Sequence, residues 1–175
     1  MAKQTIRPEE MGEFFFEIYK NSFPIEDVIN HLKDFFTEAE FPSDEVMSVE
    51  LDYLQMYIIS KAVHIRFPSH KDVFRKNFLE KTLCAIQDYL PEELANRRYS
   101  DFLDAMVEYA TKEKEIDTHL KRQQAQIEFG RYISNRVVGD NSGDELPLVM
   151  YFYSLYAEYL LSIIDLIDTS VEIIE

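Results

Sequence analysis

Residues 43–68 read SDEVMSVELDYLQMYIISKAVHIRFP, and this stretch decides the predicted fold. Its apolar residues recur with the 3.6-residue period of an α-helix. The main stripe consists of Met47, Leu51, Leu54, Ile58, Ala62 and Ile65. A second apolar stripe covers most of the remaining surface of this helix and leaves only a narrow polar strip. We therefore expect the helix to lie at the centre of a core. Ser43 is a suitable N-cap, and Phe67-Pro68 ends the helix.

The segments on both sides show the same helical spacing. One example is the segment after Pro24, whose apolar stripe consists of Ile25, Val28, Ile29, Leu32, Phe35 and Phe36. The chain has 4 Gly and 6 Pro, which is little turn material for an all-β fold. We therefore predict an all-α fold, a single-domain helical bundle of about six to seven helices over residues 1–175. The predicted helices begin at or near Pro8, Pro24, Ser43, Ser69, Pro91, Ser100 and Pro147.

The segment of residues 100–137 contains no Pro and a single Gly, Gly130. One continuous helix over this length would be about 55 Å long. A compact domain of this size has a radius of gyration of about 16 Å. The apolar pattern also weakens across residues 111–115. We predict one long helix with a kink or a turn within residues 111–118.

The last predicted helix raises the question of a membrane span. Residues 146–164 carry a single charge, Glu158, and are long enough to cross a bilayer. Glu158 in hydrocarbon would cost a few kcal/mol, and no Lys or Arg follows Arg136 to anchor the helix. We predict a largely buried helix and no membrane partner. Its tyrosines are candidates for an interface or pocket lining, namely Tyr151, Tyr153, Tyr156 and Tyr159.

The charge is strongly acidic and unevenly distributed. The net charge is −15, and residues 137–175 contain acidic side chains but no Lys or Arg. Binding to a nucleic-acid backbone or to an anionic membrane depends on Lys and Arg, so neither is expected. The acidity favours solubility. An alternative is an acidic face that binds a basic partner or mimics nucleic acid.

One cysteine, Cys84, excludes an internal disulfide. It lies in the apolar run Leu83–Ile86, where we expect a small buried side chain. The first ten residues show no apolar segment typical of a signal peptide. Both observations favour a cytoplasmic location.

A local cluster of basic residues lies between residues 61 and 81, where only Asp72 and Glu80 oppose it. It is the best candidate in the sequence for contact with an anion or an acidic partner. The alternative is internal charge matching with the acidic N- and C-terminal segments. The candidate contact patch consists of Lys61, His64, Arg66, His70, Lys71 and Arg75.

The search for catalytic motifs finds no glycine-rich phosphate loop, no HExxH, no cysteine pair and no G-x-S-x-G. His31 follows Asp27 by four residues, and His119 follows Glu115 by the same spacing. Such pairs on one helical face can supply two metal ligands, although they are common on protein surfaces. We predict no cofactor and no metal.

An acidic motif near the N-terminus carries one enzyme hypothesis. Residues 9–13 read E-E-x-x-E, and Glu17 lies one turn further. This motif resembles the first magnesium-binding motif of all-α nucleotide pyrophosphatases of the MazG and dUTPase type. The resemblance implies Mg²⁺ held against a phosphate chain by Glu9, Glu10, Glu13 and Glu17. It covers five residues, and the chain lacks the E-x-x-D that the second half of the pattern requires.

The absence of catalytic motifs favours a non-enzymatic helical protein with an interaction or regulatory role. The aromatic residues and the tyrosine-rich last helix favour a homodimer. Three alternatives stay open: an apolar small-molecule carrier with a Phe- and Tyr-lined pocket, a Mg²⁺-dependent nucleotide pyrophosphohydrolase, and an acidic antagonist of a nucleic-acid-binding protein.

Overall fold

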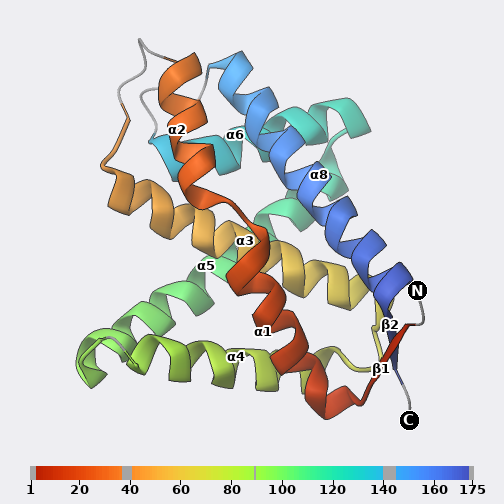
Figure 1. Ribbon diagram of the computed structural model, residues 1–175. Coiled ribbons are helices and arrows are strands. Elements are labelled where there is room, and N and C mark those ends of the chain that lie inside the picture. The colour runs from red at the N-terminus through yellow and green to blue at the C-terminus, as the bar shows by residue number, and fades with distance from the viewer. Residues whose placement is uncertain (1–2, 37–40, 89, 140–144, 174–175) are drawn as a thin grey trace. The chain divides into compact units, whose positions relative to one another are not determined.

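The structure is a computed structural model, and it describes residues 3–36, 41–88, 90–139 and 145–173. This part of the chain contains seven α-helices, which confirms the all-α prediction (Figure 1). A 3-10 turn, η1 (Pro8–Glu10), precedes the first of them. The helices are α1 (Met11–Ser22), α2 (Ile25–Phe35), α3 (Asp44–Arg66), α4 (Lys71–Gln87), α5 (Glu92–His119), α6 (Arg122–Val138) and α8 (Leu146–Ser170).

Two short strands were not predicted. β1 (Gln4–Ile6) pairs in parallel with β2 (Val171–Ile173), and Gln4 lies opposite Val171. Both segments are rich in β-branched residues, which favour strands. The last helix ends at Ser170, immediately before β2 begins.

The contacts divide the chain into two compact units. Unit 1 comprises residues 1–23, 58–105 and 159–175, and unit 2 comprises residues 24–57 and 106–158. Three helices, α3, α5 and α8, contribute residues to both units. The prediction of one domain over residues 1–175 stays a prediction.

In unit 1, α1 packs against α4 through phenylalanine rings. The rings of Phe15 and Phe74 meet edge to face with centroids 5.6 Å apart, and Phe74 stacks on Phe78 at 5.1 Å. The two helices approach closely at Gly12, where a Cβ atom would lie 2.5 Å from the Cβ of Asn77. A glycine is therefore required at this contact.

Unit 2 contains α2 and α6 together with parts of the three shared helices. Its core includes Leu51, Phe129, Ile133 and Phe152, all of which are buried. α6 and α8 approach closely at Gly130, where a Cβ atom would overlap the carbonyl oxygen of Val149.

The long segment of residues 100–137 is two helices, and its break lies outside the predicted range of 111–118. α5 ends at His119, and Lys121 is extended at φ −70° and ψ 152° before α6 begins. Ser100, predicted to begin a helix, lies inside α5. Residues 111–118 stay helical because their inner positions are occupied by Ile116, which is buried, and Glu113, which bonds to neighbouring helices.

α8 is buried along one face only, which is less than predicted. Leu148 and Phe152 are buried, whereas Leu146 and Met150 are exposed. By length and composition alone α8 could cross a membrane, and 28% of its apolar window is buried. Core helices of soluble proteins can have the same length and apolar composition.

Cys84 is exposed, so the expectation of a buried thiol was wrong. The buried residues nearby on α4 are Phe78 and Thr82. Cys84 follows Thr82 by two residues, or about 200° around the helix, and therefore points away from the buried face.

Candidate interaction surface

A polar cluster lies inside unit 2, centred on the carboxylate of Glu113 on α5. The Tyr57 hydroxyl, from α3, donates a hydrogen bond of 2.6 Å to one oxygen of this carboxylate. The Tyr156 hydroxyl, from α8, donates a hydrogen bond of 2.5 Å to the other. One carboxylate therefore joins three helices.

A second polar group in unit 2 is the guanidinium of Arg136 on α6. Its Nε donates to Glu50 of α3 at 2.8 Å, and another of its nitrogens donates to Glu108 of α5. The Arg136–Glu50 pair is mostly buried, with about a fifth of each side chain exposed. Charge-assisted bonds of this kind are stronger than neutral ones.

Tyr109 connects the two polar groups. Its ring stacks on that of Tyr57 with centroids 5.3 Å apart, and the Arg136 guanidinium lies 5.1 Å from its centroid. Its hydroxyl is buried without a hydrogen-bond partner among the described residues. We name the residues Glu50, Tyr57, Tyr109, Glu113, Arg136 and Tyr156 the Glu113–Arg136 cluster.

The tyrosines of the Glu113–Arg136 cluster are held in the protonated form. Burial first, and then the Glu113 charge, raise the pKa values of Tyr57 and Tyr156 well above their ordinary range. Burial also raises the pKa of Tyr109, although the Arg136 charge opposes it. The hydroxyls of Tyr57 and Tyr156 therefore act as hydrogen-bond donors that hold helices together.

An aromatic surface lies on the outside of unit 2, where the end of α2 meets the beginning of α8. The His31 ring lies between Phe35 and Tyr151, with centroid distances of 4.3 and 5.2 Å. Phe35 is 72% exposed, Leu146 58% and Met150 44%. We name His31, Phe35, Leu146, Met150 and Tyr151 the aromatic surface.

Phe35 was predicted on the inner stripe of its helix, and this placement was wrong. Val28, Ile29 and Leu32 of that stripe are buried, as predicted. Phe35 is the last residue of α2, and the ring of Phe36 rather than Phe35 contacts Tyr151. The helical period alone does not tell whether a neighbouring element covers the last turn.

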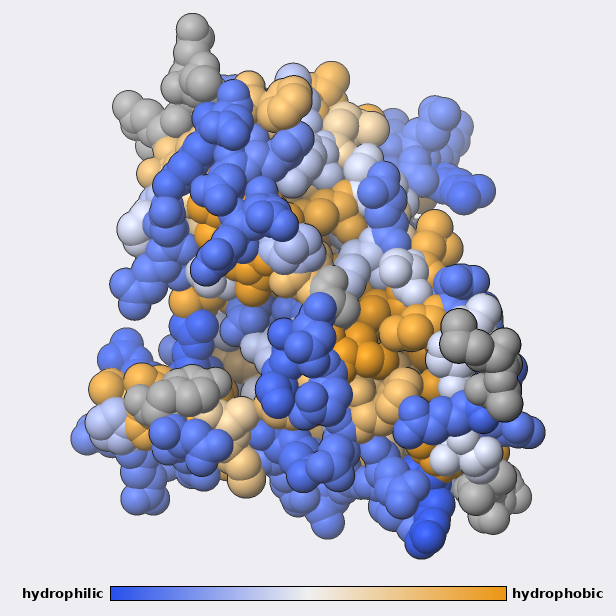
Figure 2. Space-filling model, in the orientation of Figure 1, coloured by the Kyte–Doolittle hydropathy of each residue, from blue (hydrophilic) through white to orange (hydrophobic). Residues whose placement is uncertain are grey.

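The aromatic surface has an acidic border. Asp27 and Asp34 on α2 and Glu158 on α8 are exposed, and none of them forms an ion pair with a described residue. The one basic residue of α2, Lys33, is paired with Asp44 at 2.5 Å. Figure 2 shows hydrophobic residues at the surface over the first turns of α8, next to the hydrophilic outer face of α2.

The predicted basic patch lies in unit 1, at the turn between α3 and α4. Arg66 forms an ion pair with Asp168 of α8 at 2.5 Å. Nearby, Lys81 pairs with Glu13 at 3.3 Å. These pairs favour internal charge matching with the acidic terminal segments. Of the remaining patch residues, His64, Lys71 and Arg75 are exposed, and Lys61 and His70 are half-buried.

The four acids of the candidate Mg²⁺ site lie on η1 and α1, each beside a polar or basic partner. Glu10 accepts the backbone N–H of Arg7 at 2.9 Å, and Glu9 lies 4.0 Å from the Arg7 guanidinium. Glu17 pairs with Lys20 at 3.0 Å, and Glu13 pairs with Lys81 as described above. Among the described residues, no three His, Cys, Asp or Glu side chains are grouped as a metal site would require.

The four candidate tyrosines of α8 do not form one surface. Tyr156 and Tyr159 are buried, whereas Tyr151 and Tyr153 are half-buried. Tyr159 contacts the ring of Phe23 at 4.7 Å. Only Tyr151 of the four belongs to the aromatic surface.

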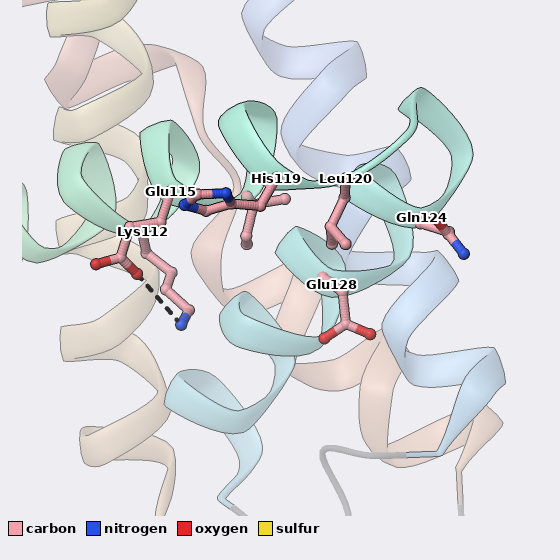
Figure 3. Close-up of a pocket in the computed structure, with 7 residues that line it drawn as sticks. Lys112, Glu115, His119, Leu120, Gln124 and Glu128 are labelled. Carbon is pink, nitrogen blue, oxygen red and sulfur yellow. Dashed lines mark ion pairs between the residues drawn. The ribbon is translucent and has the colours of Figure 1, made fainter.

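A shallow hollow of about 470 Å³ lies at the turn between α5 and α6 (Figure 3). Figure 3 shows Lys112 and Glu115 as an ion pair on α5, and Glu128 comes from α6. His119 and Leu120 complete the turn side. The lining contains no Phe or Tyr, so it differs from the aromatic pocket expected of a carrier of apolar molecules.

Comparison with protein-family models, with curated proteins and with solved structures found no match. The functional proposal therefore depends on the geometry of this chain. Sequence reasoning missed the Glu113–Arg136 cluster, although one signal was present. Glu113 stands on the same helical stripe as Tyr109 and Ile116, which places a charge at an inner position.

Proposed function

We propose that this chain is a non-enzymatic protein-interaction module and that it binds its partner through the aromatic surface of unit 2. The observation that carries the proposal is the exposure of Phe35 at 72% next to the stacked rings of His31 and Tyr151, with Leu146 and Met150 exposed on the first turns of α8. Exposed apolar side chains gathered in one place, rather than scattered singly, are typical of interaction sites. Aromatic residues also dominate the binding energy of protein interfaces.

The test is a quantitative binding measurement with a partner captured from the native host and then purified. The double variant Phe35→Ser with Met150→Ser should weaken binding by roughly a hundredfold, because both apolar anchors are lost. Leu94→Ser removes a similarly exposed residue, at 52%, from unit 1 and should leave binding unchanged. Equal effects of both changes would contradict the proposal.

The predicted homodimer stays a prediction; its partner would be another copy of the chain. Phe35, at 72% exposed, is accessible to a partner of either kind. Light scattering at high micromolar concentration tests it, and a monomer there would remove the homodimer. The acidic-antagonist alternative stays a prediction, as do the absence of a membrane partner and the cytoplasmic location.

A further inference from the structure

The charged residues around the aromatic surface point to the chemistry of its partner. Asp27 lies one helical turn before His31, and Asp34 lies beside Phe35 at the end of α2. Burial raises the pKa of the Tyr151 hydroxyl, and the charge of Glu158 on α8 raises it further, which places Glu158 near Tyr151. Acidic groups thus stand on both helices that form the surface.

Among the described residues, none of these three acids forms an ion pair. Lys33 is occupied by Asp44, and α8 contains no Lys or Arg along its length. A partner with Lys or Arg beside its apolar residues would supply the missing charges. The net charge of −15 would also accelerate the approach of such a partner.

We propose that the aromatic surface binds a basic amphipathic helix of another protein, an inference that rests on the proposed function. In this arrangement apolar side chains of the partner pack on Phe35, Met150 and Leu146, and its Lys or Arg side chains meet Asp27, Asp34 and Glu158. The described residues of unit 2 contain no strand, so the surface offers helix faces rather than a strand edge.

Charge disfavours a second copy as the occupant. A symmetric dimer through this surface would bring each acidic border against its own image, which places like charges together. An anionic lipid surface is disfavoured for the same reason.

The experiment measures binding of fluorescent helical peptides of about four turns by anisotropy. One peptide carries Leu on one face and Lys on the flanks, and a second has Glu in place of each Lys. We expect the Leu/Lys peptide to bind at least roughly tenfold more tightly, with an affinity that falls as salt rises. Equal binding of the two peptides would overturn the inference.

A matched pair of variants separates local charge from the overall acidity of the chain. Asp27→Asn with Asp34→Asn should weaken Leu/Lys binding by roughly tenfold. Asp101→Asn with Asp104→Asn removes the same charge from exposed positions of unit 1 and should change binding less than about twofold. Equal losses in the two variants would mean general attraction to an acidic protein and would overturn the inference.

Phe35→Ser distinguishes failure of the inference from failure of the proposed function. Loss of binding to both peptides in this variant, with no effect of Asp27→Asn and Asp34→Asn, would keep the surface and overturn the basic partner. No effect of either change would overturn both. Two further results would overturn the basic helix as the partner. If the wild-type protein is a dimer that Phe35→Ser converts to a monomer, the surface binds a second copy. If the wild-type protein binds phosphatidylcholine vesicles and Phe35→Ser abolishes this binding, the surface binds lipid.

Discussion

The interiors of the two units hold their helices together by different chemistry. In unit 1, the ring of Phe74 packs edge to face on Phe15 and stacks on Phe78. The hydroxyl of the buried Thr82 donates a hydrogen bond of 2.9 Å to the carbonyl oxygen of Phe78 in the same helix. In unit 2, tyrosine hydroxyls and the Arg136 guanidinium reach carboxylates on neighbouring helices. Ring packing depends on volume, whereas the Glu113–Arg136 cluster also depends on protonation and on directed bonds.

The largest expected effect tests the packing of unit 1. Phe74→Ala should reduce the free energy of unfolding by about 3–5 kcal/mol, because it removes a fully buried ring and leaves a cavity. Urea denaturation measures the loss. Val73→Ala, at the neighbouring exposed position, is the control and should cost far less. A small loss at Phe74 would contradict a volume-dependent core.

The next effect tests the polar interior of unit 2. Glu113→Ala should reduce the free energy of unfolding by about 2–4 kcal/mol, since two tyrosine hydroxyls lose their acceptor. Glu113→Gln retains one acceptor oxygen and should cost less. Glu115→Ala, two residues away and exposed, should be nearly neutral in the same urea titration. Equal losses at the two glutamates would show that the cluster contributes no stability.

Alkaline pH should distinguish the two interiors further. Tyr57, Tyr109 and Tyr156 have raised pKa values in the folded protein, whereas tyrosine in an unfolded chain ionises near pH 10. Below pH 10 both states keep these protons, so their contribution to stability is fully present. Above it the unfolded chain loses protons first, and stability falls by about 1.4 kcal/mol per pH unit for each such tyrosine.

Denaturation at several pH values between 9 and about 11 measures this slope. Tyr57→Phe should reduce this slope by the contribution of one tyrosine, about 1.4 kcal/mol per pH unit. Phe74→Ala should lower stability at every pH without changing the slope. An unchanged slope in Tyr57→Phe would mean that this hydroxyl ionises equally in both states.

The smallest effect on stability is expected outside both interiors. Phe35→Ser should change the free energy of unfolding by less than about 0.5 kcal/mol, because the side chain is 72% exposed. Thermal denaturation measures this change. A large loss would show that Phe35 supports the fold, and its exposure would then say little about binding.

The sequence predicts the helices well where their inner face is apolar. α3 begins after Ser43, whose hydroxyl accepts the N–H of Val46 at 3.4 Å, and it ends before Phe67-Pro68, as predicted. The prediction failed near Glu113, because a weakened apolar pattern resembles a turn when a polar side chain occupies an inner position. The hydrogen bonds that stabilise Glu113 at this inner position come from Tyr57 and Tyr156, which are far away in the chain.

The aromatic surface was only partly predictable. Tyr151 was a candidate because of its place in an apolar, tyrosine-rich helix. Phe35 was assigned to the core, because a periodic pattern shows which side of a helix is apolar and does not show what covers each turn. The pairing of α2 with α8 in three dimensions supplies that information.

The continuity of α3, α5 and α8 through both units has a practical consequence for dissecting the protein. Unit 1 is assembled from three stretches of chain and unit 2 from two, so no single expression fragment encodes either one. A boundary placed at residue 57 or 105 would sever a helix at an inner turn and expose carbonyl and amide groups that now bond to each other. Point substitution rather than truncation is therefore the way to assign a property to one half of the molecule.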